Sequence, residues 1–275
     1  LTPAEILVHS SNIGAAKIGI ALGRKGLYGA LRSFGFGERT LVNLPCETSG
    51  LVRDPAGWYE IDAATNAFGQ GMSVTVLQLA MAMGALANEG RLMRPMLVKR
   101  VTDPHGQVVD EPAPEVRGQA VSPLIARLVT DMLVGVTAGE GTGLEAAVDG
   151  YLVAGKTGTA QKPDTEHGGY ADDKWSSSFV GYAPAHAPRL VIAVIIDEPM
   201  IAHYGGVVAA PAFRRIMGAS LRHLGVPPSI DQASVARRAS EDVAPTPGEG
   251  AAARTRTIEA DALAQPGGGE SANEA

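Results

Sequence analysis

The chain has 275 residues, of which 45% are hydrophobic, and its formal net charge is −6. This length accommodates one large domain with an appendage or two small domains, and the negative charge argues against a nucleic-acid-binding protein. The single cysteine, Cys46, excludes a disulfide within the chain. The six scattered histidines form neither HxH nor HExxH, so neither a metal site nor a cofactor is predicted.

The N-terminal stretch has helical signals. Thr2, Pro3 and Glu5 combine a capping box with proline at the first helical position, which predicts a helix to about residue 9. A loop at residues 10–12 then precedes a second helix. Glycines at 23 and 26 interrupt that helix before a further helical piece at 27–34. Residues 35–70 are rich in glycine, proline and aspartate and are predicted to be irregular.

Two apolar helices are predicted in the middle of the chain. Ser73 or Thr75 caps the first, which ends at Gly90, and its apolar residues on nearly every side predict a buried central helix. Ser122 and a following proline begin the second helix. The residues of this helix that are predicted to face inward are Ile125, Val129, Leu133 and Val136.

The C-terminal half of the chain has strand signals. Residues 151–159, 175–182 and 189–196 are three successive candidate strands, and 207–224 form a closing helix. Helices followed by an antiparallel meander predict an α+β fold or a layered α/β/α arrangement. From Ser229 onward aromatic residues are absent, and proline, glycine, alanine and glutamate are common. We therefore predict a domain at residues 1–228 and a disordered tail at 229–275.

Two short motifs could carry chemistry: Ser-Ser-Asn at residues 10–12 and Lys-Thr-Gly-Thr at residues 156–159. Either one alone is more often a polar loop or an exposed strand end, because short motifs are permissive. Together they resemble the S-D-N and K-T-G elements of serine β-lactamases and penicillin-binding proteins.

These residue types suit acyl transfer through a serine nucleophile. A second serine hydroxyl can relay a proton to the leaving amine, and an asparagine amide can hold the lysine and the substrate carbonyl in place. A permanently positive lysine on a strand attracts a substrate carboxylate. Gly158 is expected to leave room for the substrate backbone to lie along that strand. The Thr159 N–H would be one oxyanion-hole donor.

The chain as a whole resembles the division-type class B penicillin-binding proteins over about residues 1–224. Further blocks occur in family order: Phe-Gly-Phe-Gly at 34–37, Phe-Gly-Gln-Gly at 68–71, Ala-Asn-Glu-Gly at 87–90, Gly-Thr-Gly at 141–143 and Trp-Ser-Ser-Ser-Phe-Val-Gly at 175–181. The resemblance implies an α/β (α+β) penicillin-binding/β-lactamase-like transpeptidase fold, in which helices pack on an antiparallel sheet beside a mainly helical subdomain. It also implies a relay hydroxyl on Ser10, a positioning amide on Asn12, a strand cation on Lys156, and carboxylate-binding hydroxyls on Thr157 and Thr159.

The implied activity is that of a peptidoglycan D,D-transpeptidase. Such an enzyme acylates its serine with the D-Ala-D-Ala end of a stem peptide and passes the acyl group to the amine of a neighbouring strand. Penicillin imitates that dipeptide. The expected partners are stem peptides, β-lactams, a membrane glycan polymerase and other division proteins, without nucleic acid. The resemblance also implies a parent anchored in the inner membrane, with this domain facing the periplasm or the cell exterior.

The chain departs from the family pattern at three points. No serine is followed three residues later by lysine, so we expect an N-terminally truncated fragment that is inactive alone, with nucleophile and base upstream of Leu1. Cys46 stands where the family usually has glycine, and Val76 where proline is common.

Three alternatives stay open. Residues 150–157 match the P-loop pattern, and residues 194–198 resemble a Walker B strand, so a P-loop NTPase is the rival from another class. Its context argues against it, because a P-loop needs a strand before its first glycine and a helix at its lysine. The second alternative is a serine β-lactamase or D,D-carboxypeptidase, which belongs to the same superfamily and shares both motifs. A penicillin-binding module without turnover is the third.

Overall fold

A three-stranded antiparallel sheet forms the core of the computed structural model, which describes residues 1–164 and 167–229. Its strands are β5 (Ala154–Pro163), β6 (Tyr170–Ala183) and β7 (Leu190–Asp197), in that order across the sheet. They confirm the three predicted strands. The first begins three residues later than predicted, because Tyr151 pairs with Val148 in an isolated bridge.

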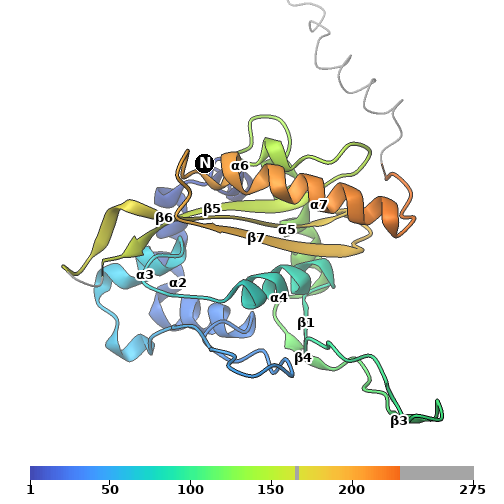
Figure 1. Ribbon diagram of the computed structural model, residues 1–275. Helices are drawn as coiled ribbons and strands as arrows, with labels where there is room; N and C mark the ends of the chain where they lie inside the picture. The colour runs from blue at the N-terminus through green and yellow to red at the C-terminus, as the bar shows by residue number, and fades with distance from the viewer. Residues whose placement is uncertain (165–166, 230–275) are drawn as a thin grey trace, which may run out of the picture. The chain divides into compact units, whose positions relative to one another are not determined.

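One face of the sheet is covered by α7 (Ala210–His223), as Figure 1 shows. Phe213, Met217 and Leu221 follow one another at intervals of four residues, so they share one side of the helix, and all are fully buried. They pack with Phe179 of β6 in one hydrophobic cluster. The predicted closing helix is therefore present, but Ala209 separates α7 from a short α6 (Gly205–Val208).

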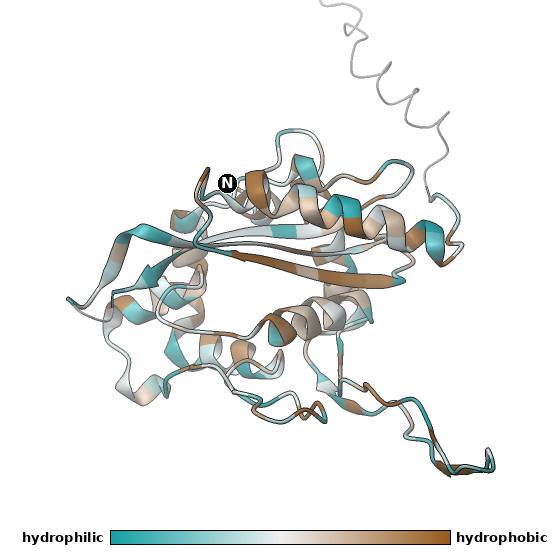
Figure 2. Cartoon of the chain, viewed as in Figure 1, coloured by the Kyte–Doolittle hydropathy of each residue, from teal (hydrophilic) through white to brown (hydrophobic). Residues whose placement is uncertain are grey.

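The opposite face carries α4 (Val76–Ala87) and α5 (Pro123–Val136). Met83 of α4, Leu133 of α5 and Tyr182 of β6 form a second buried cluster. The Tyr182 hydroxyl lies 2.6 Å from the Thr130 hydroxyl of α5, and burial raises the pKa of Tyr182. Phe179 and Tyr182 of β6 therefore point to opposite faces of the sheet, one into the cluster under α7 and the other into the cluster under α4 and α5. Helices on both faces of the sheet confirm the layered α/β/α arrangement. Figure 2 shows the apolar character of β7 between them.

The two middle helices begin where predicted but bury different faces. Thr75 caps α4 by accepting a hydrogen bond from the Gln78 N–H at 3.1 Å. Val76 is nevertheless 46% exposed, so the prediction of a helix buried on every side is wrong. In α5, Ile125 is 43% exposed, and Ala126 takes its place in the core. Both residues fit a helical repeat with Leu133, so the packing against the sheet decides which one is buried.

A helical subdomain comes from the N-terminal part of the chain. The predicted capping box begins α1 (Pro3–Val8): the Thr2 N–H donates to Glu5 Oε2 at 2.7 Å. The next helix, α2 (Asn12–Ser33), is kinked at Gly23, whose φ is 70°. The predicted interruption is thus a kink at one glycine, and residue 26 stays helical.

A helix not expected from the sequence, α3 (Glu60–Ala67), packs on α2 within the stretch predicted to be irregular. Asp62 Oδ2 accepts a hydrogen bond from the Tyr59 N–H at 2.8 Å and so gives this backbone donor at the start of the helix a partner. Tyr59 is not one of the usual N-cap residues, so the start of the helix lacks the ordinary sequence signal. A Cβ at Gly19 would collide with the Ala63 carbonyl, which shows how closely α2 and α3 approach.

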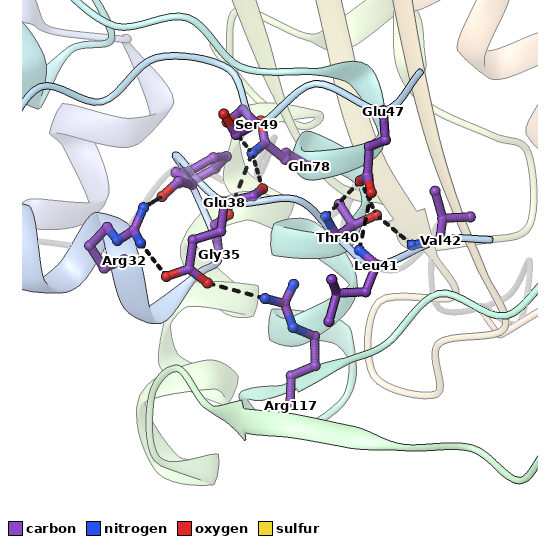
Figure 3. A network of polar contacts seen from close by, with 11 residues as sticks. Arg32, Gly35, Glu38, Thr40, Leu41, Val42, Glu47, Ser49, Gln78 and Arg117 are labelled. Carbon is purple, nitrogen blue, oxygen red and sulfur yellow. Dashed lines mark hydrogen bonds and ion pairs between the residues drawn. The ribbon is translucent and has the colours of Figure 1, made fainter. Parts of the chain in front are cut away.

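The chain between α2 and α3 is irregular apart from a 3₁₀ turn, η1 (Pro55–Gly57), and polar contacts hold it in place (Figure 3). Gln78 is 1% exposed, and its Nε2 donates to the carbonyls of Glu38 and Ser49, each at 2.8 Å. The Glu38 carboxylate pairs with both Arg32 and Arg117. One buried glutamine in α4 therefore fixes two points of the loop.

Four short strands that were not predicted form two separate ladders. β1 (Arg91–Met93) pairs with β4 (Val116–Gln119), and β2 (Val101–Thr102) pairs with β3 (Val108–Asp110). Strands of two to four residues are too short to show a repeat of two in the sequence.

The start of the predicted tail is still attached to the domain, because the Ser229 N–H donates to the Gly150 carbonyl at 2.9 Å. The rest of that prediction, residues 230–275, lies outside the described residues. Among the helices of the described ranges, none is both long and apolar enough to cross a membrane.

Candidate active site

The Lys-Thr-Gly-Thr motif lies within β5, which is an edge strand of the sheet. Lys156 is opposite Val180 and Thr159 opposite Ser177 in the antiparallel ladder with β6. A P-loop lysine begins a helix, whereas Lys156 is in a strand, so the NTPase interpretation is wrong.

The Ser-Ser-Asn motif makes the tight turn between α1 and α2. Ser10 has a φ of 52°, in the left-handed region that few side chains adopt. Ser11 is the N-cap of α2, where its Oγ accepts a hydrogen bond from the Gly14 N–H at 3.1 Å. Asn12 is the first residue of α2 rather than part of the predicted loop.

The two motifs meet in space. Lys156 Nζ donates to Ser10 Oγ at 2.8 Å and lies 3.2 Å from both the carbonyl and the hydroxyl oxygen of Thr157. Burial lowers the pKa of Lys156 to about 8. An ammonium group with this pKa is still mostly protonated at pH 7 and loses its proton as the pH rises through about 8.

A cavity of about 580 Å³ opens beside these residues. Six of the residues that line it come from the predicted site or from the Gly-Thr-Gly turn before β5: Ser10, Asn12, Gly141, Thr142, Thr157 and Thr159. The Thr142 and Thr157 hydroxyl oxygens lie 3.0 Å apart. The cavity thus joins the predicted substrate-binding threonines to the turn between α1 and α2.

Gly158 does not line this cavity. A Cβ at this position would collide with Ser178 Oγ of the neighbouring strand. Close packing between β5 and β6 therefore requires a glycine at this position. Its predicted role in substrate binding is untested.

One wall of the cavity, which contacts the threonines, was missed by sequence reasoning. It comes from Tyr204 and from the first two residues of α6, Gly205 and Gly206. The Gly205 N–H donates to Thr159 Oγ1 at 3.1 Å. A side chain at Gly205 would collide with the carbonyls of residues 158 and 178, so only glycine allows this approach. The paired glycines before a helix were the available signal.

Aromatic stacking supports this wall from outside. The His203 ring stacks on Trp175 of β6, with centroids 4.4 Å apart and planes 17° apart. The Ser177 hydroxyl, also on β6, donates to the His203 carbonyl. The segment before α6 is therefore tied to the sheet at the residue preceding Tyr204. Neither the stacking nor this hydrogen bond could be predicted from a local sequence pattern, because the residues are more than 20 positions apart.

No group of three histidine, cysteine, aspartate or glutamate residues within 1–164 and 167–229 is arranged to hold a metal ion. The polar side chains that line the cavity carry hydroxyls, the Asn12 amide and the Glu145 carboxylate, and the Lys156 amine lies beside them, bonded to Ser10. The hydroxyls and the amine can bind a carboxylate and relay a proton.

Comparison with known proteins agrees with this geometry. Residues 1–218 match the family model described as the penicillin-binding protein transpeptidase domain. The probable peptidoglycan D,D-transpeptidase PenA of Neisseria meningitidis is 40% identical over 225 residues, which are 82% of this chain and 36% of that protein. Stage V sporulation protein D of Bacillus subtilis is 39% identical over 84% of this chain and 36% of its own length.

Solved structures give the same result. The transpeptidase domain of penicillin-binding protein 3 from Burkholderia pseudomallei is 38% identical, with a TM-score of 0.74, over 84% of this chain and 67% of that one. Penicillin-binding protein 3 from Mycobacterium tuberculosis, in complex with ampicillin, is 37% identical, with a TM-score of 0.78. The match covers 84% of this chain and 53% of that one. The chain spans about a third of the length of the two curated relatives. It belongs to the penicillin-binding protein transpeptidase family.

Proposed function

We propose that this chain forms the substrate-binding part of a peptidoglycan D,D-transpeptidase that cross-links stem peptides and reacts covalently with penicillin. The observation that carries the proposal is the hydrogen bond of 2.8 Å from Lys156 Nζ to Ser10 Oγ. It joins the two motifs that acyl transfer requires, beside a cavity lined by Thr157 and Thr159. The name of the relative PenA, a probable peptidoglycan D,D-transpeptidase, supports the same activity.

In this proposal the D-Ala-D-Ala end of a stem peptide occupies the cavity, and its carboxylate is held by the Thr157 and Thr159 hydroxyls. The positive charge of protonated Lys156 favours binding of the substrate carboxylate, and its hydrogen bond to Ser10 Oγ keeps the Ser10 hydroxyl oriented. Ser10 can then pass its proton to the amine that leaves when the acyl–enzyme forms, and accept a proton from the Lys156 ammonium in its place. Asn12, on the same cavity, is assigned to hold the substrate carbonyl.

The serine that is acylated is assigned to a part of the protein outside these 275 residues, because no serine here is followed by lysine at the required spacing. The predicted localisation and partners belong to that whole protein. We propose a membrane-anchored enzyme whose domain faces the periplasm or cell exterior. It would act in septal synthesis with a membrane glycan polymerase and other division proteins.

Two lysines of β5 allow a controlled test. Lys162 lies on the same strand but forms ion pairs with Asp197 and Glu198. The protein produced from its native gene is treated with a fluorescent penicillin and examined on a denaturing gel. We expect covalent labelling of the wild type and of Lys162→Ala, and labelling of Lys156→Ala that is slower by at least about 100-fold.

A folded wild-type protein that stays unlabelled would overturn the proposal. Equal labelling rates of the two variants would remove Lys156 from the mechanism. The lifetime of the label separates a transpeptidase from a serine β-lactamase. A label that persists for hours indicates a transpeptidase, whereas its loss within seconds indicates a β-lactamase.

A further inference from the structure

The turn between α5 and β5 holds its residues rigidly against the cavity. A Cβ at Gly141 would collide with the Val136 carbonyl, and one at Gly143 would lie 2.9 Å from the Phe179 ring. The Gly143 N–H also donates to the Val136 carbonyl at 2.9 Å. The turn is therefore packed directly on the core, unlike an ordinary surface loop.

Thr142, between these glycines, attaches the same turn to both motif-bearing elements. Its N–H donates to the Val8 carbonyl of α1 at 3.3 Å, and its hydroxyl oxygen is 3.0 Å from that of Thr157 in β5. A Cβ at Gly206 would collide with the Thr142 carbonyl, so α6 also packs against the turn. These contacts fix the position of the next few residues relative to the site.

Those residues form the 3₁₀ turn η2 (Leu144–Ala146), which contains Glu145 and whose last residue is fully buried. Among the described residues that line the cavity, Glu145 is the only one with a formal charge. None of the ion pairs formed within 1–164 and 167–229 uses it. The cavity therefore presents one uncompensated carboxylate on a rigid support.

Glu145 is exposed, and a single negative charge at the wall of a cleft attracts cationic ligands. We infer that Glu145 selects substrates that carry an ammonium group, and that it binds the side-chain amine of a stem peptide's diamino residue. The inference rests on the proposed function and deepens it by naming a substrate feature. The amine belongs either to the peptide that donates the acyl group or to the peptide that accepts it.

The donor side is tested with two penicillins that differ by one group, since ampicillin is benzylpenicillin with an added α-amino group. Their second-order acylation rates are measured on the full protein, on Glu145→Gln and on Glu140→Gln. Glu140 is an exposed glutamate five residues earlier that does not line the cavity. We expect Glu145→Gln to lower the ratio of ampicillin to benzylpenicillin rates about two- to fivefold, the effect of an exposed ion pair, and Glu140→Gln to leave it unchanged.

The acceptor side is tested with a D-alanyl thioester as donor and D-lysine as acceptor, with D-alanine, which has no side-chain amine, as the matched control acceptor. The measured quantity is the ratio of aminolysis product to hydrolysis product. A fall in this ratio in Glu145→Gln alone assigns the carboxylate to the acceptor. If neither ratio changes while benzylpenicillin still acylates the protein, the inference about Glu145 is wrong and the proposed function stands. If benzylpenicillin does not acylate the wild type, the proposed function itself fails.

Discussion

Lys156 Nζ and Ser10 Oγ are 2.8 Å apart, although 146 positions separate the two residues in the chain. The lysine is fixed by the β5–β6 ladder, and the serine by a turn with positive φ between two helices. The two supports are separate elements of the fold. Their meeting is therefore a product of the tertiary fold, and it defines the candidate site.

Replacing Ser10 by alanine should slow acylation by fluorescent penicillin about 100-fold or more, because a positioned proton relay contributes 10²- to 10⁴-fold. Ser11→Ala is the matched control. It removes the N-cap of α2 and should lower the free energy of unfolding by about 1 kcal/mol without changing the acylation rate of the folded protein. Rates from stopped-flow mixing and unfolding in urea separate the two effects. A wild-type rate in Ser10→Ala would contradict the relay.

The pKa of Lys156 predicts a pH dependence of stability. Burial lowers it from 10.5 to about 8, so between pH 8 and 10.5 the unfolded chain holds a proton that the folded chain has released. The free energy of unfolding of the wild type should therefore rise relative to Lys156→Met as pH increases from 8 to 10. Urea unfolding of both proteins at each pH measures this difference.

Lys162 provides the control for that titration. Hydrogen bonds to Glu198 and Asp197 raise its pKa, so its contribution is complete below the unfolded pKa and is lost only as pH rises beyond that. The difference between the wild type and Lys162→Met should not increase from pH 8 to 10. If the Lys156 difference is equally flat, the ammonium group is not desolvated in solution.

The parts of the fold that were predicted correctly are those with a local signal. The capping box at Thr2 and Glu5, the caps at Thr75 and Ser122, and the apolar strand β7 are each specified by a few neighbouring residues. The site motifs were also recognised, because their residue types are tied to one kind of chemistry.

The parts that were missed depend on packing between distant segments. Ile125 and Ala126 fit the helical repeat equally well, and only contact with the sheet selects Ala126. Tyr204 reaches the cavity because a histidine before it stacks on Trp175. The partner of Gly158, Ser178, lies on another strand. Such relationships have no fixed spacing in the sequence.

The contact between Gly158 and Ser178 can be tested with a double-mutant cycle. Gly158→Ala should destabilise the protein, since the new methyl group collides with Ser178 Oγ. Ser178→Ala removes that oxygen and leaves its own Cβ 3.7 Å away, so it should rescue the first variant. We expect a coupling free energy of about 1 kcal/mol or more from urea unfolding, as for residues in direct contact. Purely additive effects would show that the two strands separate to accommodate the methyl group.

Gln78 should be one of the most sensitive positions outside the site. Gln78→Met keeps the size of a 1% exposed side chain. It leaves the Glu38 and Ser49 carbonyls without this donor and the Thr75 N–H without its acceptor, at a cost of about 2–4 kcal/mol. Gln119 is the control, because its Nε2 donates to the Glu89 and Val121 carbonyls at an exposed position. Water can replace it there, so Gln119→Met should cost less than about 1 kcal/mol. Equal losses in urea unfolding would argue that burial does not set the cost.

Cys46 offers the opposite prediction, a gain in stability. Its φ is 62°, in the left-handed region that costs most residues about 1–2 kcal/mol, and its side chain is exposed. Glycine adopts this conformation without strain but loses about 0.5–1 kcal/mol of chain entropy on folding. Cys46→Gly should therefore raise the free energy of unfolding by up to about 1 kcal/mol. Cys46→Ala keeps the strained backbone and should have no such effect, so a gain of equal size in both variants would place the cause in the thiol rather than in φ.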